Sequence, residues 1–227
     1  MKYAFTNGKI LNGTENMQVQ EGLCILTDGE KITDIVPATT SLTGYQVIDL
    51  QGKYIMPGLI NMHVHLAGNG KPQKKQRDNE KVVKTLMGTA LSRAIAYKVV
   101  CSFAKDEVMS GVTTIRTVGG LGSFDTRLRD KIAAGKRIGP RILAANEGIS
   151  VPGGHMAGSV AIAAGSIEEA LAHVEESRKE NVDIIKLNDV ATLDPDVLEI
   201  LYGALDDSKY TSENPKPANK DEITVGD

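Results

Sequence analysis

The sequence predicts an α/β protein in which about four β-α units form a parallel sheet behind a small N-terminal β-domain. Strand-forming stretches and tight turns fill residues 1–56. Beyond them, apolar runs alternate with helical stretches, which is typical of parallel sheets with right-handed crossovers. A closed (β/α)₈ barrel needs eight such units and about 250 residues, so residues 57–206 predict only part of one.

The N-terminal part is predicted to be a small β-sandwich with a thin core, because short strands bury little apolar surface. Asn7-Gly8 and Asp28-Gly29 are typical of two-residue hairpin turns. Three stretches are rich in strand formers, namely residues 22–27, 32–36 and 45–49.

The second part is read as alternating strands and helices. The predicted strands cover residues 55–62, 112–118, 141–145 and 182–187, the first of them buried on both faces. The predicted helices cover residues 79–110 and 124–134, then one after the capping box of Ser166 and Glu169 and one starting at Asp194 and Pro195. Residues 207–227 turn polar and predict a disordered tail.

Composition excludes several classes of partner. The formal net charge of −3 favours neither nucleic acid nor an anionic membrane. No apolar run approaches the roughly 20 residues that span a bilayer, and the first residues lack the apolar core of a signal peptide. The two cysteines, Cys24 and Cys101, fit no metal spacing or disulfide framework, so we expect a cytoplasmic protein.

His63 and His65 form the sharpest candidate site. Residues two apart in a strand point to the same side, about 7 Å apart, so two neutral imidazoles can reach one divalent metal. The pair follows an apolar strand, where parallel barrels place their active sites. The alternative is two surface histidines that lie two apart by chance.

Residues 47–65 (VIDLQGKYIMPGLINMHVH) closely resemble the entry to the amidohydrolase superfamily, and most of all its imidazolonepropionase-like branch with Xaa-Pro dipeptidase-type enzymes. Further likeness lies in residues 79–80, 101–105, 110–120, 139–143 and 149–158. The resemblance spans roughly residues 1–187 and implies a TIM (β/α)₈-type barrel with a β-sandwich appendage. It also implies a one- or two-metal hydrolytic site, usually zinc. Asn61 departs from the commoner Asp.

Lys186 lies near the end of the fourth predicted strand. By itself it reads as a solvated lysine at a strand end. The resemblance implies instead a lysine carboxylated by CO₂, whose carbamate can bridge two cations about 3.5–4 Å apart. Residues 187–191 (LNDVA) depart from the glycine-rich continuation that this role would lead us to expect.

Two residues are candidates for substrate binding. The resemblance places His155, in a glycine-rich loop, in contact with a substrate carbonyl or carboxylate, and the alternative is a loop histidine without a partner. Arg116 could bind a substrate carboxylate or pair with Asp125. His173 reads as solvated, residues 71–77 as a basic surface loop, and the weak phosphate-loop pattern of residues 119–122 lacks the third glycine of a dinucleotide fingerprint.

The expected chemistry is metal-assisted hydrolysis of a carbon–nitrogen bond in a small amide, lactam or dipeptide. The family also needs two further histidines and an aspartate base, for which this chain has no identified position. Three hypotheses therefore stay open: an N-terminal fragment that is inactive alone, a half-barrel completed by a second copy or a complementing chain, or a non-catalytic remnant.

Overall fold

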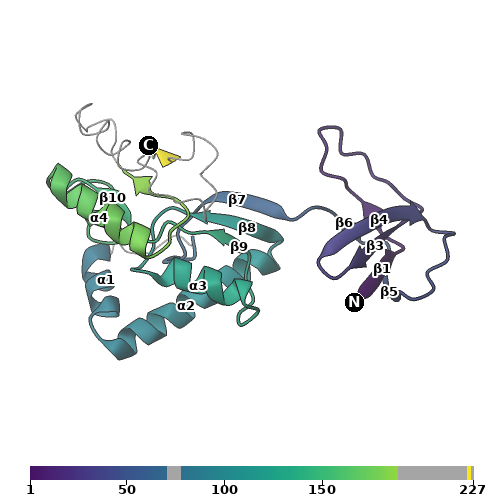
Figure 1. Cartoon of the computed structure of the whole chain (residues 1–227), viewed down its shortest axis with the longest axis horizontal. Coiled ribbons are helices and arrows are strands. Elements are labelled where there is room, and N and C mark those ends of the chain that lie inside the picture. The colour runs from purple at the N-terminus through teal and green to yellow at the C-terminus, as the bar shows by residue number, and fades with distance from the viewer. Residues whose placement is uncertain (71–77, 189–223, 226–227) are drawn as a thin grey trace. The chain divides into compact units, whose positions relative to one another are not determined.

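The computed structural model describes residues 1–70, 78–188 and 224–225 (Figure 1). Two compact units, Met1–Gly58 and Leu59–Asp227, divide the chain, and each is described by itself. The basic run 71–77, the helix expected at Asp194 and all of the expected tail except Thr224–Val225 lie outside the described residues. Within the described part, no helix is long and apolar enough to cross a membrane.

The first unit contains strands only. They are β1 Lys2–Thr6, β2 Lys9–Ile10, β3 Leu23–Asp28, β4 Lys31–Pro37, β5 Gln46–Asp49 and β6 Tyr54–Ile55. One sheet has the order β4-β3-β1-β5, with β1 parallel to β5 and the other pairs antiparallel, and β2 and β6 form a second, parallel pair. The buried apolar residues in this unit are few, as the short strands predict. They are Ala4, Ile10, Cys24, Ile25 and Leu26.

The hairpin predicted at Asp28-Gly29 is confirmed, whereas the one at Asn7-Gly8 is wrong. β3 and β4 pair antiparallel, with Asp28 opposite Lys31. Asn7 instead carries the chain from one sheet to the other, in a left-handed conformation with φ 52°. The Asn7 side chain donates to Asp49 at 3.0 Å and its carbonyl accepts from Gly52 N at 2.7 Å. The strands on either side of Asn7 pair with β5 and β6 rather than with each other.

The second unit is α/β. Its elements are β7 Leu59–Val64, α1 Asn79–Met87, α2 Ala90–Met109, β8 Val112–Thr117, α3 Phe124–Ala133, β9 Arg141–Leu143, β10 Gly148–Ser150, β11 Ala161–Ala163, α4 Ile167–Lys179, β12 Lys186–Leu187 and β13 Thr224–Val225. Strands β7-β8-β9 form one parallel sheet and β11-β10-β12-β13 another. The α/β class is confirmed, and the described residues form no closed barrel.

The fourth predicted strand joins the sheets only through its ends. Asp183 N donates to the carbonyl of Ala144, directly after β9, at 2.8 Å, and the regular ladder of β12 covers only Lys186–Leu187. The short strands β10 and β11 were not predicted, because a glycine-rich loop around His155 was expected after the third strand. The order of β7, β8, β9 and then the segment that leads to β12 matches the sequence prediction.

The single helix predicted over residues 79–110 is wrong, because the chain forms two helices there. Thr89 begins α2 as its N-cap: its hydroxyl accepts from Ser92 N at 3.1 Å, and the Ser92 hydroxyl accepts from Thr89 N at 3.1 Å. This capping box uses Ser where Glu or Gln is usual, so its pattern is weak in the sequence. The backbone N–H groups at the start of α2 are satisfied locally, which allows the chain to turn after Gly88.

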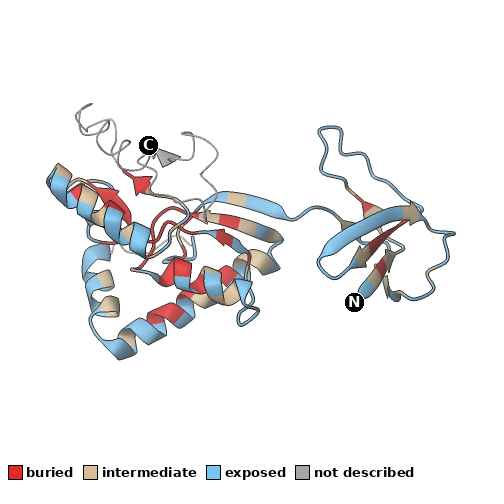
Figure 2. Cartoon of the chain, in the orientation of Figure 1, coloured by how far each residue is buried: buried red, intermediate tan, exposed pale blue. Residues whose placement is uncertain are grey.

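The core of the second unit lies between the β7-β8-β9 sheet and helices α2 and α3, which lie on one side of it (Figure 1). Each strand contributes side chains to this layer, and their buried positions appear red in Figure 2. The central members are Val64, Leu66, Val100, Ile115, Leu128 and Ile142. Because this packing fixes the three strands, the carboxyl ends of β7, β8 and β9 are held at fixed positions.

The expected burial of residues 55–62 on both faces is wrong. The run is interrupted at Pro57-Gly58, so that β6 ends at Ile55 and β7 begins at Leu59. Within β7, Leu59 is 50 % and Ile60 is 63 % exposed. The physical reason is position: among the described strands β7 pairs only with β8, so β7 is an edge strand.

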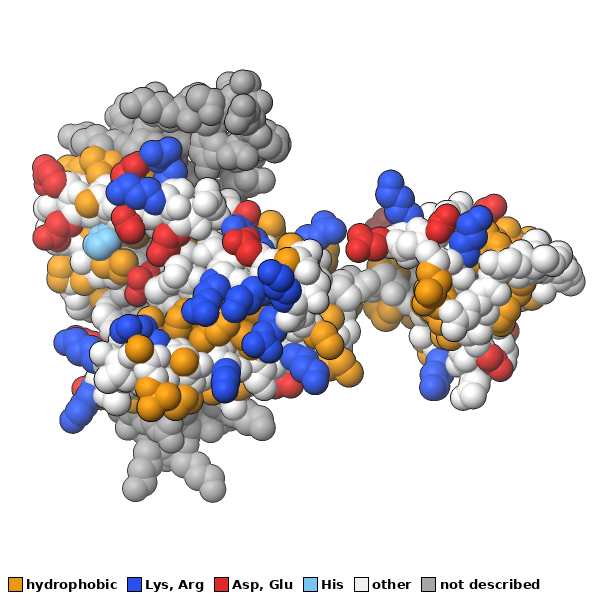
Figure 3. All heavy atoms as spheres, turned by 60° about the horizontal axis from the view of Figure 1, so that its bottom comes forward, with side chains coloured by type: hydrophobic (Ala, Val, Ile, Leu, Met, Phe, Trp, Pro, Cys, Tyr) orange, Lys and Arg blue, Asp and Glu red, His pale blue; other side chains and the backbone are white. Residues whose placement is uncertain are grey.

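Helices α2 and α3 also meet through an aromatic contact. The ring of Tyr97 packs edge-on against Phe124, with centroids 5.2 Å apart. The Arg127 guanidinium lies 4.3 Å and the Lys131 ammonium 5.0 Å from the centroid of the same ring. Figure 3, turned toward this side of the unit, shows basic side chains gathered beside exposed apolar ones. Burial raises the pKa of Tyr97 to about 12.

Asp125 is a buried acid at the start of α3. Its side chain is 1 % exposed, and neither oxygen has a hydrogen-bond partner among the described groups. Burial raises its pKa from 3.8 to about 6. The Thr117 hydroxyl lies close enough to offset part of that rise, although no hydrogen bond of acceptable geometry joins it to either oxygen.

We predict that Asp125→Asn stabilises the protein at neutral pH and not at acidic pH. The folded protein binds the Asp125 proton more tightly than the unfolded chain, so the stabilisation by the protonated acid is complete below pH 3.8 and is lost as the pH rises through about 6. The amide stays neutral throughout. Urea unfolding should therefore show a gain of about 1–3 kcal/mol for the variant at pH 8, shrinking toward zero at pH 4. A gain independent of pH would contradict the prediction.

Candidate metal centre

His63 and His65 lie side by side at the carboxyl end of β7. Their ring centroids are 5.3 Å apart, with an angle of 68° between the ring planes. Residue 63 lies in the strand and residue 65 directly after it, so both side chains leave the chain on the same side. This places two imidazoles close enough to share one ligand.

The His65 ring is oriented by the loop after β8. Its Nδ1 lies 3.0 Å from the carbonyl oxygen of Gly119. Because a carbonyl oxygen only accepts, Nδ1 carries the hydrogen and Nε2 keeps its lone pair for another partner. Metal-binding histidines commonly use this arrangement, in which a backbone carbonyl fixes the tautomer and the ring orientation.

Gly119 allows the ring to come this close. A Cβ at this position would lie 3.1 Å from His65 Nδ1 and 3.0 Å from the carbonyl oxygen of Val160, and the backbone φ is 143°. Any other residue would be strained and crowded here. The contribution of Gly119 was not foreseen, since the only signal was a pair of glycines directly after a strand.

His63 lies among basic neighbours. Its pKa is lowered first by burial and then by the charges of His65, Lys186, Arg116 and His155, in decreasing order. The candidate residues from four segments of the sequence therefore lie within electrostatic reach of one imidazole. The low pKa favours the neutral ring, which is the form that binds metal. Asn61 Oδ1 accepts from His63 N at 3.2 Å, so this residue orders the backbone beside the ring.

Lys186 is buried in β12, at 3 % exposure, so the alternative of a solvated lysine is wrong. The segment before it is held firmly: Asp183 Oδ2 accepts from Ala144 N and from Arg129 Nη1, each at 2.8 Å. On the neighbouring strand, a Cβ at Gly148 would lie 3.3 Å from Lys186 Cγ. These contacts fix the backbone that carries Lys186, whose charge lies within electrostatic reach of His63.

Arg116 and His155 are held in different ways. Arg116 Nε donates to the carbonyl of Met62 at 2.8 Å, next to His63 in the chain. The alternative pairing with Asp125 is wrong for the described side chains, because no ion pair joins them and Asp125 is buried. The carbonyl of His155 accepts from Asn188 Nδ2 at 3.3 Å, which ties its loop to the end of β12. His173 lies on α4 and is not among the groups that shift the pKa of His63.

The histidine pair fits part of a metal site. Two imidazoles match the nitrogen ligands of zinc, and three or four protein ligands are usual. Residues 1–70, 78–188 and 224–225 contain no group of three or more His, Cys, Asp or Glu side chains that could hold a metal. An unmodified lysine ammonium cannot ligate, whereas a carbamate on Lys186 could. The described residues thus offer two ligands and one conditional ligand.

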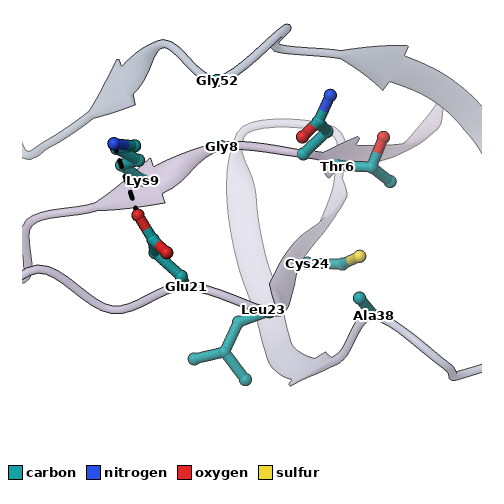
Figure 4. A pocket seen from close by; sticks show the side chains of 10 residues that line it. Thr6, Gly8, Lys9, Glu21, Leu23, Cys24, Ala38 and Gly52 are labelled. Carbon is teal, nitrogen blue, oxygen red and sulfur yellow. Dashed lines mark ion pairs between the residues drawn. The ribbon is translucent and has the colours of Figure 1, made fainter.

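A recess in the first unit does not compete with this site. It lies beside β1, β2 and β3, and Thr6, Lys9, Glu21 and Cys24 are among its lining residues (Figure 4). Lys9 and Glu21 form an ion pair there at 3.4 Å. The lining includes one carboxylate and one thiol but no histidine, so it lacks the imidazole ligands of the candidate metal centre.

The sequence profile of the Amidohydrolase family matches residues 54–196, more than half of the chain. The matched segment begins at β6 and includes both histidines of the pair, Arg116, His155 and Lys186. Every residue proposed above for the metal centre or substrate thus lies inside the match.

Several known proteins are similar to this chain. A solved Xaa-Pro dipeptidase with bound methionine is 29% identical, with a TM-score of 0.64, over 83% of this chain and 47% of that chain. A solved candidate prolidase from Bifidobacterium longum is 31% identical, with a TM-score of 0.62, over 82% and 40%. A dihydroorotase from Wolbachia sp. subsp. Drosophila simulans (strain wRi) is 36% identical over 75 residues, 33% of this chain and 17% of the relative. The chain thus spans less than half the length of each of these proteins.

We predict that Gly119→Ala displaces the His65 ring, in addition to destabilising the fold through the positive φ at position 119. The added methyl group would crowd the His65 ring and the Val160 carbonyl, and the residue would keep an unfavourable positive φ. Chemical denaturation should show a loss of about 1–3 kcal/mol. The ring nitrogen signals of His65 should also shift in NMR spectra.

Gly135→Ala is the matched control. Gly135 also has a positive φ, 68°, but a Cβ there would meet nothing within 4 Å. This variant should lose some stability and leave the His65 signals unchanged. Equal effects of the two variants on His65 would show that the Gly119 contact does not orient the ring.

Proposed function

Since the chain belongs to the amidohydrolase family, we propose that it forms the metal-binding N-terminal part of a hydrolase that cleaves carbon–nitrogen bonds in small amides, lactams or dipeptides. The observation that carries this proposal is the His63–His65 pair, with one ring oriented by Gly119 so that its Nε2 is left for a ligand. Dipeptides ending in proline are the favoured substrate class, because the Xaa-Pro dipeptidase and the candidate prolidase resemble this chain over most of its length.

His63 and His65 would hold a divalent metal, with zinc as the favoured ion, and a carbamate on Lys186 would add a third ligand or bridge to a second ion. When bound, such a metal lowers the pKa of its water toward about 7 and polarises the scissile carbonyl. Two observations support this assignment: Lys186 is buried in β12, and its charge lies within electrostatic reach of His63.

Arg116 and His155 are proposed to bind the substrate. Arg116 uses Nε to hold the Met62 carbonyl, which anchors the guanidinium beside His63 and leaves its two NH₂ groups for a carboxylate. A dipeptide presents such a carboxylate next to its scissile amide. His155 reaches the same region from the loop after β10 and would orient a carbonyl or carboxylate.

The proton-transferring base is not assigned to any described residue. Every charged neighbour that shifts the pKa of His63 is basic, so the expected aspartate is not among them. We therefore propose first that the chain is an N-terminal fragment that is inactive alone. A cytoplasmic location and the absence of a nucleic-acid partner remain proposals that rest on charge and composition.

The exposed edge of β7 favours a second candidate, a half-barrel completed by another copy of the chain. Leu59, Ile60 and Met62 are all at least 45 % exposed along this edge. A strand added beside β7 would pair with the backbone along the edge that no described strand occupies, and it would cover these side chains. A non-catalytic remnant would need neither the metal nor the added strand.

We predict that the purified chain binds zinc through the histidine pair. His63→Ala and His65→Ala should each reduce the zinc retained after dialysis, and the double variant should retain none, because a single remaining imidazole binds zinc weakly. Elemental analysis measures the bound metal. His173→Ala, on α4, is the matched control and should bind as the unmodified chain does. Undiminished zinc in the double variant would reject the metal site.

Hydrolysis tests the reaction separately from metal binding. Alanyl-proline and dihydroorotate, a dipeptide and a cyclic amide, are incubated with the zinc-loaded chain, and product release is measured by chromatography. Activity that disappears in the double histidine variant supports a complete enzyme and rejects both the inactive fragment and the remnant. Zinc binding without hydrolysis supports the inactive fragment.

We predict that Ile60→Lys disrupts any self-association through β7. A lysine at this position places a charge on the apolar edge and opposes strand addition. Light scattering after size-exclusion chromatography should report a mass above the monomer for the unmodified chain and the monomer mass for the variant. Ile138→Lys, at a residue that is 68 % exposed, is the control. A monomer for the unmodified chain at all concentrations would reject the second-copy candidate.

A further inference from the structure

Asp125 lies in a buried environment where an acidic side chain lowers the stability of the fold. It lies within the first turn of α3, fully buried, and among the described groups neither carboxylate oxygen has a hydrogen-bond partner. Buried polar atoms without partners destabilise a folded protein. Asp125 is not among the proposed metal ligands or substrate-binding residues. Its role must therefore be inferred from the groups that it contacts.

The carboxyl group of Asp125 packs against Gly120. A Cβ at Gly120 would lie 2.6 Å from Asp125 Oδ2, 2.9 Å from Cγ and 3.0 Å from Oδ1. The carboxyl group therefore fills the space that a side chain at position 120 would need. The preceding glycine, Gly119, faces a different neighbour, since its carbonyl holds His65 Nδ1 at 3.0 Å.

The helix that carries Asp125 is itself anchored. Asn146 Oδ1 accepts from Thr126 N at 3.0 Å, and Asn146 Nδ2 donates to Thr126 Oγ1 at 3.1 Å. The first turn of α3 is thus fixed to the loop after β9. Asp125 can act as a rigid support for the two glycines, because its own backbone has little freedom to move.

We propose that Asp125 is a positioning residue for the histidine pair: its carboxyl group supports Gly120, and the Gly119–Gly120 turn in consequence holds the His65 ring in one tautomer and orientation. For its catalytic consequence this inference rests on the proposed function of His65 as a metal ligand. The contact chain from Asp125 through the glycines to His65 does not depend on that function.

The first test compares Asp125→Ala with Asp125→Asn in the full chain. ¹⁵N–¹H correlation spectra of the histidine ring nitrogens, recorded without metal, report the tautomer of each ring. Asp125→Ala should convert His65 from a single Nδ1–H tautomer to a mixture and weaken zinc binding by about 10–100-fold in calorimetry. Asp125→Asn keeps the shape of the side chain and should restore both readouts. A merely structural role would lower stability without changing the tautomer.

Complementary changes at Gly120 give a second test. Gly120→Ala should disturb His65 because its methyl group collides with Asp125, whereas Gly120→Ala combined with Asp125→Ala should restore the single tautomer, since the new methyl group occupies the space that the carboxyl group left. This comparison stays informative if Asp125→Ala fails to fold, because the double variant and Gly120→Ala alone still make opposite predictions.

Thr126→Val is the control for general damage to α3. It removes the Thr126 hydroxyl that accepts from Asn146, lowering stability without touching Gly120. It should leave the His65 tautomer unchanged. An unchanged tautomer in folded Asp125→Ala, equal disturbance by Asp125→Asn and Asp125→Ala, or no rescue in the double variant would each overturn the inference. A lack of zinc binding by the unmodified chain would overturn the proposed function alone, because the tautomer is measured without metal.

Discussion

The contact between the His65 ring and the Gly119 carbonyl connects the end of β7 to the loop after β8, and the candidate centre depends on it. It exists because two parallel strands end at the same edge of a sheet: His65 directly follows β7, and Gly119, which tolerates a close neighbour, lies two residues after β8. The core of Val64, Ile115 and Ile142 fixes the strands, and the loop then fixes the ring. The packing of the sheet against its helices thus determines the orientation of the His65 Nε2 atom.

Much of the fold could be predicted from the sequence. The order of β7, β8, β9 and the segment leading to β12 followed from apolar runs that alternate with helices, and the start of α4 at Ser166 followed from its cap, whose hydroxyl accepts from Glu169 N at 3.3 Å. Asn7-Gly8 failed because turn residues show where a chain bends and not which strands then pair. The break before α2 was missed because its capping box uses Ser92 where Glu or Gln is usual. The burial of β7 was wrongly expected because apolar composition cannot reveal that a strand lies at the edge of a sheet.

The residues of the candidate site could be proposed from the sequence, whereas the residues that support them could not. His63, His65, Lys186, Arg116 and His155 could be singled out from spacing and family resemblance, and in the structure the other four lie within electrostatic reach of His63. The contributions of Gly119, Gly120 and Asp125 arise from contacts between segments, which no local pattern encodes. Lys186 shows the same limit, since a lysine at a strand end gives no local sign that its side chain is enclosed.

The exposed edge of β7 also bears on the tendency of this protein to aggregate. An edge strand with exposed apolar side chains can pair with an extended segment that it meets, whether from a correct partner or from an unfolded neighbour. Because the encounter rate grows with concentration, non-productive pairing at this edge would compete most with correct assembly in concentrated solution. A partner strand or a charged residue that covers this edge should therefore limit aggregation even where the core behind it is unchanged.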